Sequence, residues 1–160
     1  MKFKVFCGGT CADSYWRSDL FNSIDPELKT LCFDPVVADW TPECQEIERK
    51  VKEIVPIHLY VLTPRQIGTF TIHELTMSTI FHKKNVISYI INEKGCCYYD
   101  DDLPLEWTIG RLKSLKAQHD ELTQFSNYIN LNSDWEELEP YSISIEYLAR
   151  YLEQCLTQKH

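Results

Sequence analysis

The stretch VPIHLYVL, residues 55 to 62, is the most strand-like segment of the sequence. It is almost continuously apolar and contains β-branched and aromatic side chains, which is typical of a strand buried on both faces of a sheet. The segment just before it, DWTPECQEIERKVKEI (39–54), predicts a helix with Thr41 at the N-cap and Pro42 at the first helical position. A helix that leads into a fully buried strand favours an α/β fold with a parallel sheet.

The same alternation of strands and helices extends along the chain in both directions. Strands are predicted at 3–10, 30–37 and 85–92, and helices at 14–24, with Asp13 or Ser14 as N-cap, and within 66–78. Beyond residue 93 the pattern weakens to a helix at 108–122, a candidate fifth strand at 125–131 and an amphipathic closing helix at 144–156. We therefore expect a single domain over residues 1–160, in which a parallel sheet of four or five strands lies between two layers of helices.

Composition and charge narrow the class of partner. The 160 residues carry a net charge of −8, which argues against a nucleic-acid polymer or an anionic membrane as the main partner, because both bind clustered Lys and Arg. The N-terminal MKFKVFCGG has too short an apolar run for a secretory signal, and the seven cysteines are odd in number and scattered, so we expect a cytoplasmic protein. Cys7 and Cys11 lack a second pair at zinc-ligand spacing, and we expect no metal site.

Ligands of an open parallel sheet bind beyond the carboxyl ends of its strands, and the first such loop is CGGTCADSYWR, residues 7 to 17. Gly8 and Gly9 either form a tight turn or let the backbone approach a ligand with its N–H groups. Arg17 suits a carboxylate or phosphate, or is an ordinary surface residue. Trp16 is either part of the core or a stacking platform.

The second loop, FDPVVADWTPE (33–43), offers Asp34, Asp39 and Trp40. An aspartate before proline is a common turn former. Two acids and an indole in one loop would also suit a hydroxyl-rich ring.

The third loop opens a helix with QIGTFTIHELTMS, residues 66 to 78. Thr71 and Glu74 match the Thr-x-x-Glu capping box, in which Glu74 would bind a backbone N–H group. The alternative is that Glu74 points into the strand-end cleft, where the helix dipole favours the ionised form that a carboxylate nucleophile needs. Both interpretations remain open from the residues alone.

Four segments in order resemble the nucleoside 2-deoxyribosyltransferase-like proteins. The resemblance covers roughly residues 3 to 92 and is carried by VFCGGTCADSYWRSDL (5–20), FDPVVADWTPECQEIERK (33–50), IHLYVLTP (57–64) and GTFTIHELTMS (68–78). It implies a flavodoxin-like or Rossmann-like fold. It also implies cleavage of an N-glycosidic bond by a glutamate nucleophile on the helix after the third strand, with retention and without a cofactor.

The resemblance also implies roles for individual residues. Glu74 corresponds to the nucleophile. The deoxyribosyltransferase members of the family carry a second acid on the helix before the third strand. For this acid we choose Glu48 over Glu46, with Asp39 as an alternative donor. The i,i+4 pair of Glu48 and Lys52 is equally typical of a solvated helix face. The residues expected to bind substrate are Gly8, Gly9, Thr10, Trp16, Arg17, Asp34, Trp40, Gly68 and Thr69.

The expected substrate is a small-molecule nucleoside or nucleotide. Hydrolysis of an NAD-like glycosidic bond is one alternative, and non-catalytic binding of a nucleotide or nucleotide-derived signal is another. Enzymes of this family often complete their pockets with a neighbour's loop, so the resemblance implies a homo-oligomer. Its contact would come from the aromatic C-terminal region, including Tyr98, Tyr99, Trp107 and Trp135, although these residues would equally serve the chain's own core.

Overall fold

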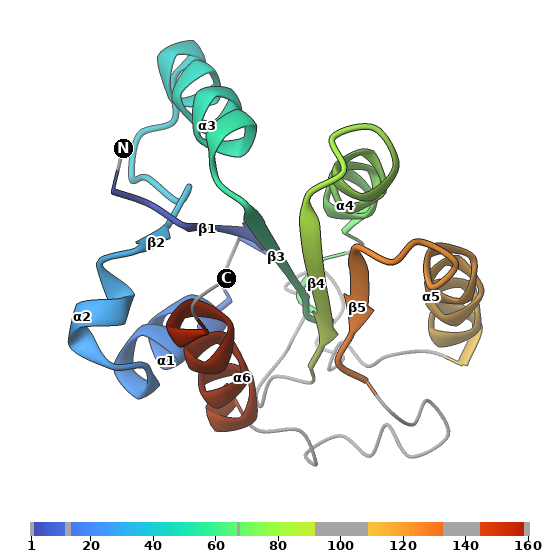
Figure 1. Cartoon of the computed structure of the whole chain (residues 1–160). Helices are drawn as coiled ribbons and strands as arrows, with labels where there is room; N and C mark the ends of the chain where they lie inside the picture. The colour runs from blue at the N-terminus through green and yellow to red at the C-terminus, as the bar shows by residue number, and fades with distance from the viewer. Residues whose placement is uncertain (1, 12–13, 67, 92–108, 133–144, 159–160) are drawn as a thin grey trace, which may run out of the picture.

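The computed structural model describes residues 2–11, 14–66, 68–91, 109–132 and 145–158, and Figure 1 shows their arrangement. The strands are β1 (Val5–Gly9), β2 (Cys32–Phe33), β3 (Ile57–Leu62), β4 (Asn85–Ile90) and β5 (Tyr128–Asn130). The helices are α1 (Trp16–Ser23), α2 (Pro26–Lys29), α3 (Pro42–Ile54), α4 (Thr69–Ile80), α5 (Ile109–Leu122) and α6 (Ile145–Thr157).

The five strands form one sheet in which every pair is parallel, in the order β2-β1-β3-β4-β5. The register pairs Gly9 of β1 with Val61 of β3. The order reverses between β1 and β3, because β2 is added on one side of β1 and all later strands on the other. This strand order is the flavodoxin-like arrangement, in which ligands bind outside the carboxyl ends of the strands at the reversal point.

Helices cover both faces of the sheet, which makes the three-layer α/β fold (Figure 1). One core cluster joins β1, β3 and β4 to α1 and α6, and includes Trp16, Leu59 and Leu148. The other joins the opposite face of the sheet to α3, α4 and α5, and includes Tyr60 and Leu75. The expected α/β fold with a parallel sheet between helices is confirmed, with five strands.

Several local details differ from the expectation. The second strand contains only Cys32–Phe33, and the short helix α2 with Asp25 as its N-cap was not predicted. Helix α1 begins at Trp16, so Ser14 is not its N-cap, while Asp13 lies outside the described residues. The aromatic residues expected to make an oligomer contact, Tyr98, Tyr99, Trp107 and Trp135, also lie outside the described residues. No helix in the described ranges is long and apolar enough to cross a membrane.

Two histidines are fully buried beside serine hydroxyl groups. His58 of β3 has Nδ1 2.8 Å from Ser78 Oγ and Nε2 3.0 Å from the carbonyl oxygen of Lys52, and Ser78 Oγ lies 2.9 Å from the Tyr60 hydroxyl. His119 Nε2 lies 3.2 Å from Ser88 Oγ. Burial lowers the pKa of both imidazoles to about 4, because the charged form loses its hydration there. The core therefore holds both rings in the neutral form near pH 7.

Candidate functional site

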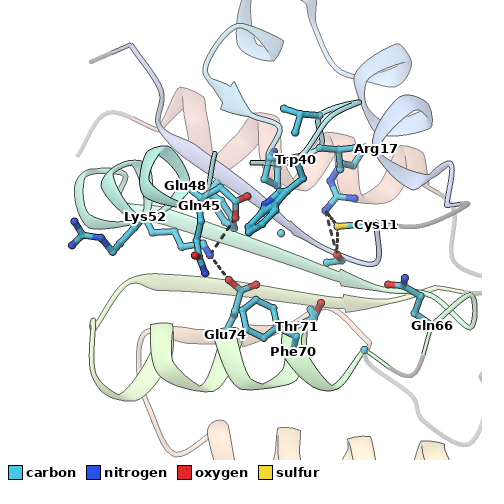
Figure 2. Close-up of a pocket in the computed structure, with 18 of the residues that line it drawn as sticks. Cys11, Arg17, Trp40, Gln45, Glu48, Lys52, Gln66, Phe70, Thr71 and Glu74 are labelled. Atoms are coloured by element: carbon cyan, nitrogen blue, oxygen red, sulfur yellow. Dashed lines mark hydrogen bonds and ion pairs between the residues drawn. The ribbon is translucent and has the colours of Figure 1, made fainter. Parts of the chain in front are cut away.

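A cleft of about 1200 Å³ opens where β1 and β3 end and where α3 faces α4. Figure 2 shows its walls, with Glu48 and Lys52 on the α3 side and Thr71 and Glu74 on the α4 side. The lining residues are Phe6, Gly8, Gly9, Cys11, Arg17, Pro35, Val36, Val37, Trp40, Pro42, Gln45, Glu46, Glu48, Arg49, Lys52, Gln66, Gly68, Thr69, Phe70, Thr71 and Glu74. Its position is the one expected for a ligand site in this strand order.

The glycines at the end of β1 bring the backbone to the cleft. Gly9 has φ +128, and a Cβ there would clash with the carbonyl oxygen of Val61 on the neighbouring strand. A Cβ on Gly8 would meet the rings of Tyr60 and Phe6. Both positions therefore require glycine, and both line the cleft as predicted.

Arg17 stabilises this first loop through hydrogen bonds to its backbone. Its side chain is nearly buried and donates hydrogen bonds to the carbonyl oxygens of Cys7 at 3.1 Å, Thr10 at 2.7 Å and Gly9 at 3.3 Å. Its Nε also lies 3.5 Å from Asp34 Oδ1. Arg17 lines the cleft, but its guanidinium is largely occupied by the loop that carries the glycines.

Three predicted substrate contacts are corrected by burial or position. Trp16 is 1 % exposed in the core, where its indole N–H donates to the Thr10 carbonyl at 2.9 Å. Thr10 is also buried, and its hydroxyl accepts the backbone N–H of Thr63 at 3.0 Å. Asp34 pairs with Arg17 and accepts the backbone N–H of Val36 at 3.0 Å. None of the three predicted residues lines the cleft; they support the loops that do.

The second loop separates Asp39 from Trp40. Asp39 is exposed and does not line the cleft, which removes it as a proton donor there. Trp40 lines the cleft with 59 % of its surface exposed.

The start of α4 tests the capping-box interpretation of Glu74. The N-cap is Gly68, in the left-handed conformation with φ 73, and no side chain caps the helix. Thr71 is a buried residue within the first turn, so the Thr71–Glu74 capping box is wrong. Glu74 lies on the cleft side of the helix, as Figure 2 shows.

The carboxylate of Glu74 forms an ion pair with Lys52 Nζ from the opposite wall. The same ammonium lies 3.8 Å from Glu48 Oε2 and 4.5 Å from the centre of the Phe6 ring. The side chains of Glu74, Glu48 and Lys52 are only 16 %, 20 % and 22 % exposed. A solvated Glu48–Lys52 pair was one of the two interpretations of the sequence, and the structure adds Glu74 as a third member of a partly buried cluster.

The two carboxyl groups share a cation but differ in environment. Burial raises the pKa of Glu48 above its usual range, and the neighbouring Glu74 charge adds to this. Lys52, Arg17 and the Trp40 side chain oppose the rise without cancelling it. Glu48 is therefore the carboxyl group of the cleft that is disposed to hold a proton.

We expect Lys52→Met to destabilise the fold by about 1 to 3 kcal/mol near pH 7, because two partly buried carboxyl groups would then face each other without a cation. Urea unfolding followed by far-UV circular dichroism measures the change. Lys50→Met is the matched control, since Lys50 pairs with Glu46 at 3.4 Å on the exposed face of the same helix. The control should lose no more than about 0.5 kcal/mol, and equal losses in the two variants would contradict the cluster.

Among the described residues, no group of three His, Cys, Asp or Glu side chains is arranged to hold a metal ion. Cys7 is buried, while Cys11 lines the cleft and donates from Sγ to the carbonyl oxygen of Gly9. Comparison with known proteins finds no match for the chain among protein-family models, curated proteins or solved structures. The site must therefore be interpreted from its own geometry.

Proposed function

We propose that the protein cleaves or transfers the N-glycosidic bond of a (deoxy)nucleoside or nucleotide, with Glu74 as nucleophile and Glu48 as general acid. The observation that supports this most directly is the pair of carboxyl groups on opposite walls of one cleft, both in contact with Lys52. Two carboxyl groups roughly 5 to 5.5 Å apart are the machinery of retaining glycosidases. Lys52 Nζ contacts both Glu48 and Glu74, so the two acids lie close together across the cleft.

In the first step a carboxylate oxygen of Glu74 forms a bond to the anomeric carbon as the bond from that carbon to the base nitrogen breaks. The electron pair of the broken bond stays on the base, which takes the proton of Glu48. In the second step Glu48, now ionised, accepts a proton from water or from an incoming base, which attacks the glycosyl-enzyme and releases Glu74. Two displacements give net retention at the sugar, and no cofactor is needed.

The electrostatics favour this division of roles between the two acids. The raised pKa of Glu48 suits a group that must be protonated when substrate binds. The ion pair with Lys52 suits a group that must act as a carboxylate. Asp39, the alternative donor, is exposed outside the cleft, so Glu48 is the acid in this proposal.

The sugar would lie on the floor of the cleft. Gly68 and Thr69 line its wall at the start of α4, and Gly8 and Gly9 line it at the end of β1. Backbone N–H groups at such positions suit sugar hydroxyl groups or a 5′-phosphate. A second base that excludes water would favour transfer, and entry of water would favour hydrolysis.

Incubation of the wild-type protein with deoxynucleosides, deoxynucleotides and NAD, each with and without a second base, tests the proposal. Chromatography should show a free base or an exchanged nucleoside from at least one substrate. A ligand that raises the melting temperature but is never cleaved would instead indicate a nucleotide-binding protein. If no ligand is cleaved and none raises the melting temperature, both the catalytic and the binding proposal lose their support.

Glu48→Gln should remove the basic limb of the pH profile of kcat/KM. The wild-type rate should fall as pH rises through the raised pKa of Glu48, because the proton needed by the leaving base is then lost. Gln cannot supply that proton, so we expect a loss of about 10²- to 10⁴-fold with ordinary bases and a much smaller loss with an activated leaving group. Initial rates across the pH range measure both effects.

Glu53→Gln is the control for this variant. Glu53 lies on the same helix, but its carboxylate is exposed, does not line the cleft and pairs with Arg49 at 2.9 Å. The control should keep the wild-type profile. A basic limb that survives in Glu48→Gln would assign the proton donor to another group.

A further inference from the structure

The mouth of the cleft carries two large aromatic side chains that the catalytic proposal does not use. Trp40 is 59 % exposed and Phe70 is 67 % exposed, and both line the cleft. Figure 2 shows Trp40 and Glu48 on the α3 side of the cleft, and Phe70 and Glu74 on the α4 side. Each wall therefore pairs one aromatic ring with one carboxyl group.

The surroundings of Trp40 are apolar. Pro35, Val36, Val37 and Pro42 line the same cleft beside Trp40, and both valines are nearly half exposed. Apolar surface that gathers around a cleft with a polar floor is typical of a ligand site. The cleft thus accepts a molecule with one flat apolar part and one polar part.

We propose that Trp40 and Phe70 form a stacking clamp that holds a planar heteroaromatic base at the mouth of the cleft. This inference rests on the proposed function, since the base is the leaving group of that reaction. Every nucleobase has a flat π-face, and stacking on an aromatic side chain depends little on which base is bound. Trp40, earlier expected to suit a hydroxyl-rich ring, is assigned to the base instead.

The geometry of the helices orients the bound molecule. Phe70 and Glu74 are four residues apart on α4, so they lie one turn apart on one side of the helix. Trp40 and Glu48 both lie on the α3 side of the cleft. A base held between the rings therefore directs its glycosidic bond toward the two carboxyl groups, with the sugar on the floor near Gly8.

Exposure alone would not carry this argument, because Phe81 at the other end of α4 is also 67 % exposed. Phe81 does not line the cleft, whereas Phe70 does. The two phenylalanines thus provide a matched pair: the same residue type, the same helix and the same exposure, with only one ring beside the candidate site.

Calorimetric titration of adenosine and uridine into Glu74→Gln protein tests the clamp without turnover. Phe70→Ala and Trp40→Ala, each added to that background, should weaken binding about 5- to 100-fold. Phe70→Tyr and Trp40→Phe, which keep a ring, should restore most of the affinity, and Phe81→Ala should leave it unchanged. Deoxyribose 5-phosphate, which lacks a base, should bind the Phe70 variants and the Glu74→Gln parent equally.

Unchanged adenosine affinity in Phe70→Ala would overturn the clamp, as would an equal loss for deoxyribose 5-phosphate. Failure of both nucleosides to bind the Glu74→Gln parent would also overturn it. The outcome is separable from that of the proposed reaction. If wild-type protein cleaves no substrate but Phe70→Ala still weakens the binding of adenosine and not of deoxyribose 5-phosphate, the reaction is rejected and the base site is supported. If wild-type protein cleaves a substrate but neither ring affects binding, only the reaction is supported.

Discussion

Glu74→Gln should lower kcat/KM for base release by at least about 10³-fold, the range expected when a covalent nucleophile is removed. The amide keeps the size of the side chain but cannot form a stable glycosyl ester, so neither hydrolysis nor base exchange can proceed. Initial rates with the best substrate of the nucleoside and nucleotide panel measure the loss. Circular dichroism should show that the fold is retained, since Glu74 lies on the cleft wall and not within either core cluster.

Mass spectrometry provides an independent check of the same residue. Acid quenching of wild-type protein during turnover should trap a glycosyl adduct on the peptide that contains Glu74, and the Glu74→Gln protein should show none. Full base release by Glu74→Gln, or an adduct on another carboxylate, would reject Glu74 as the nucleophile. Loss of activity together with loss of fold would be resolved by Glu74→Asp, which restores the charge with a shorter side chain.

The second large effect is loss of stability in mild acid. His58 and His119 have folded pKa values of about 4, below the ordinary value near 6.5, because both rings are buried. Between these values the unfolded chain binds protons that the folded protein does not, so the free energy of unfolding falls as pH falls from about 6.5 to 4. Each histidine contributes about 3 kcal/mol to this loss, which together rivals the whole stability of an ordinary domain.

Urea unfolding at a series of pH values between about 7 and 4.5 measures this dependence. Replacement of His119 by Gln should make the curve shallower, because one buried imidazole is removed. His73→Gln is the matched control, since His73 lies on the exposed face of α4. A free energy of unfolding that stays constant from pH 7 to 5 would show that the two rings become protonated in the folded state.

The order of strands and helices was predictable because the apolar pattern has few competing explanations. Segments such as Ile57–Leu62 are apolar on both faces, which indicates a central parallel strand without reference to any partner. The short β2 was overestimated, since Val36 and Val37 look strand-like but line the cleft instead of joining the sheet. Side-chain type alone does not reveal where pairing with β1 ends.

The candidate site was predictable in part. Gly9 and Gly68 have backbone angles that favour glycine, and both border the cleft. The i,i+4 partner of Lys52, Glu48, was visible in the sequence, whereas its second partner Glu74 comes from a different helix. Trp16 was placed near substrate by its loop, but the direction of its ring depends on α6 and the sheet beneath.

Every described residue that lines the cleft comes from the span between Phe6 and Glu74. The described later elements, β4, β5, α5 and α6, supply the remainder of the two core clusters. The residues of the candidate site are thus confined to the earlier span, which also contributes to both core clusters. A mutational library aimed at new ligand preference can therefore be confined to the cleft-lining positions of that span. Within the described part of the chain, substitutions after that span would alter folding robustness and expression more than selectivity.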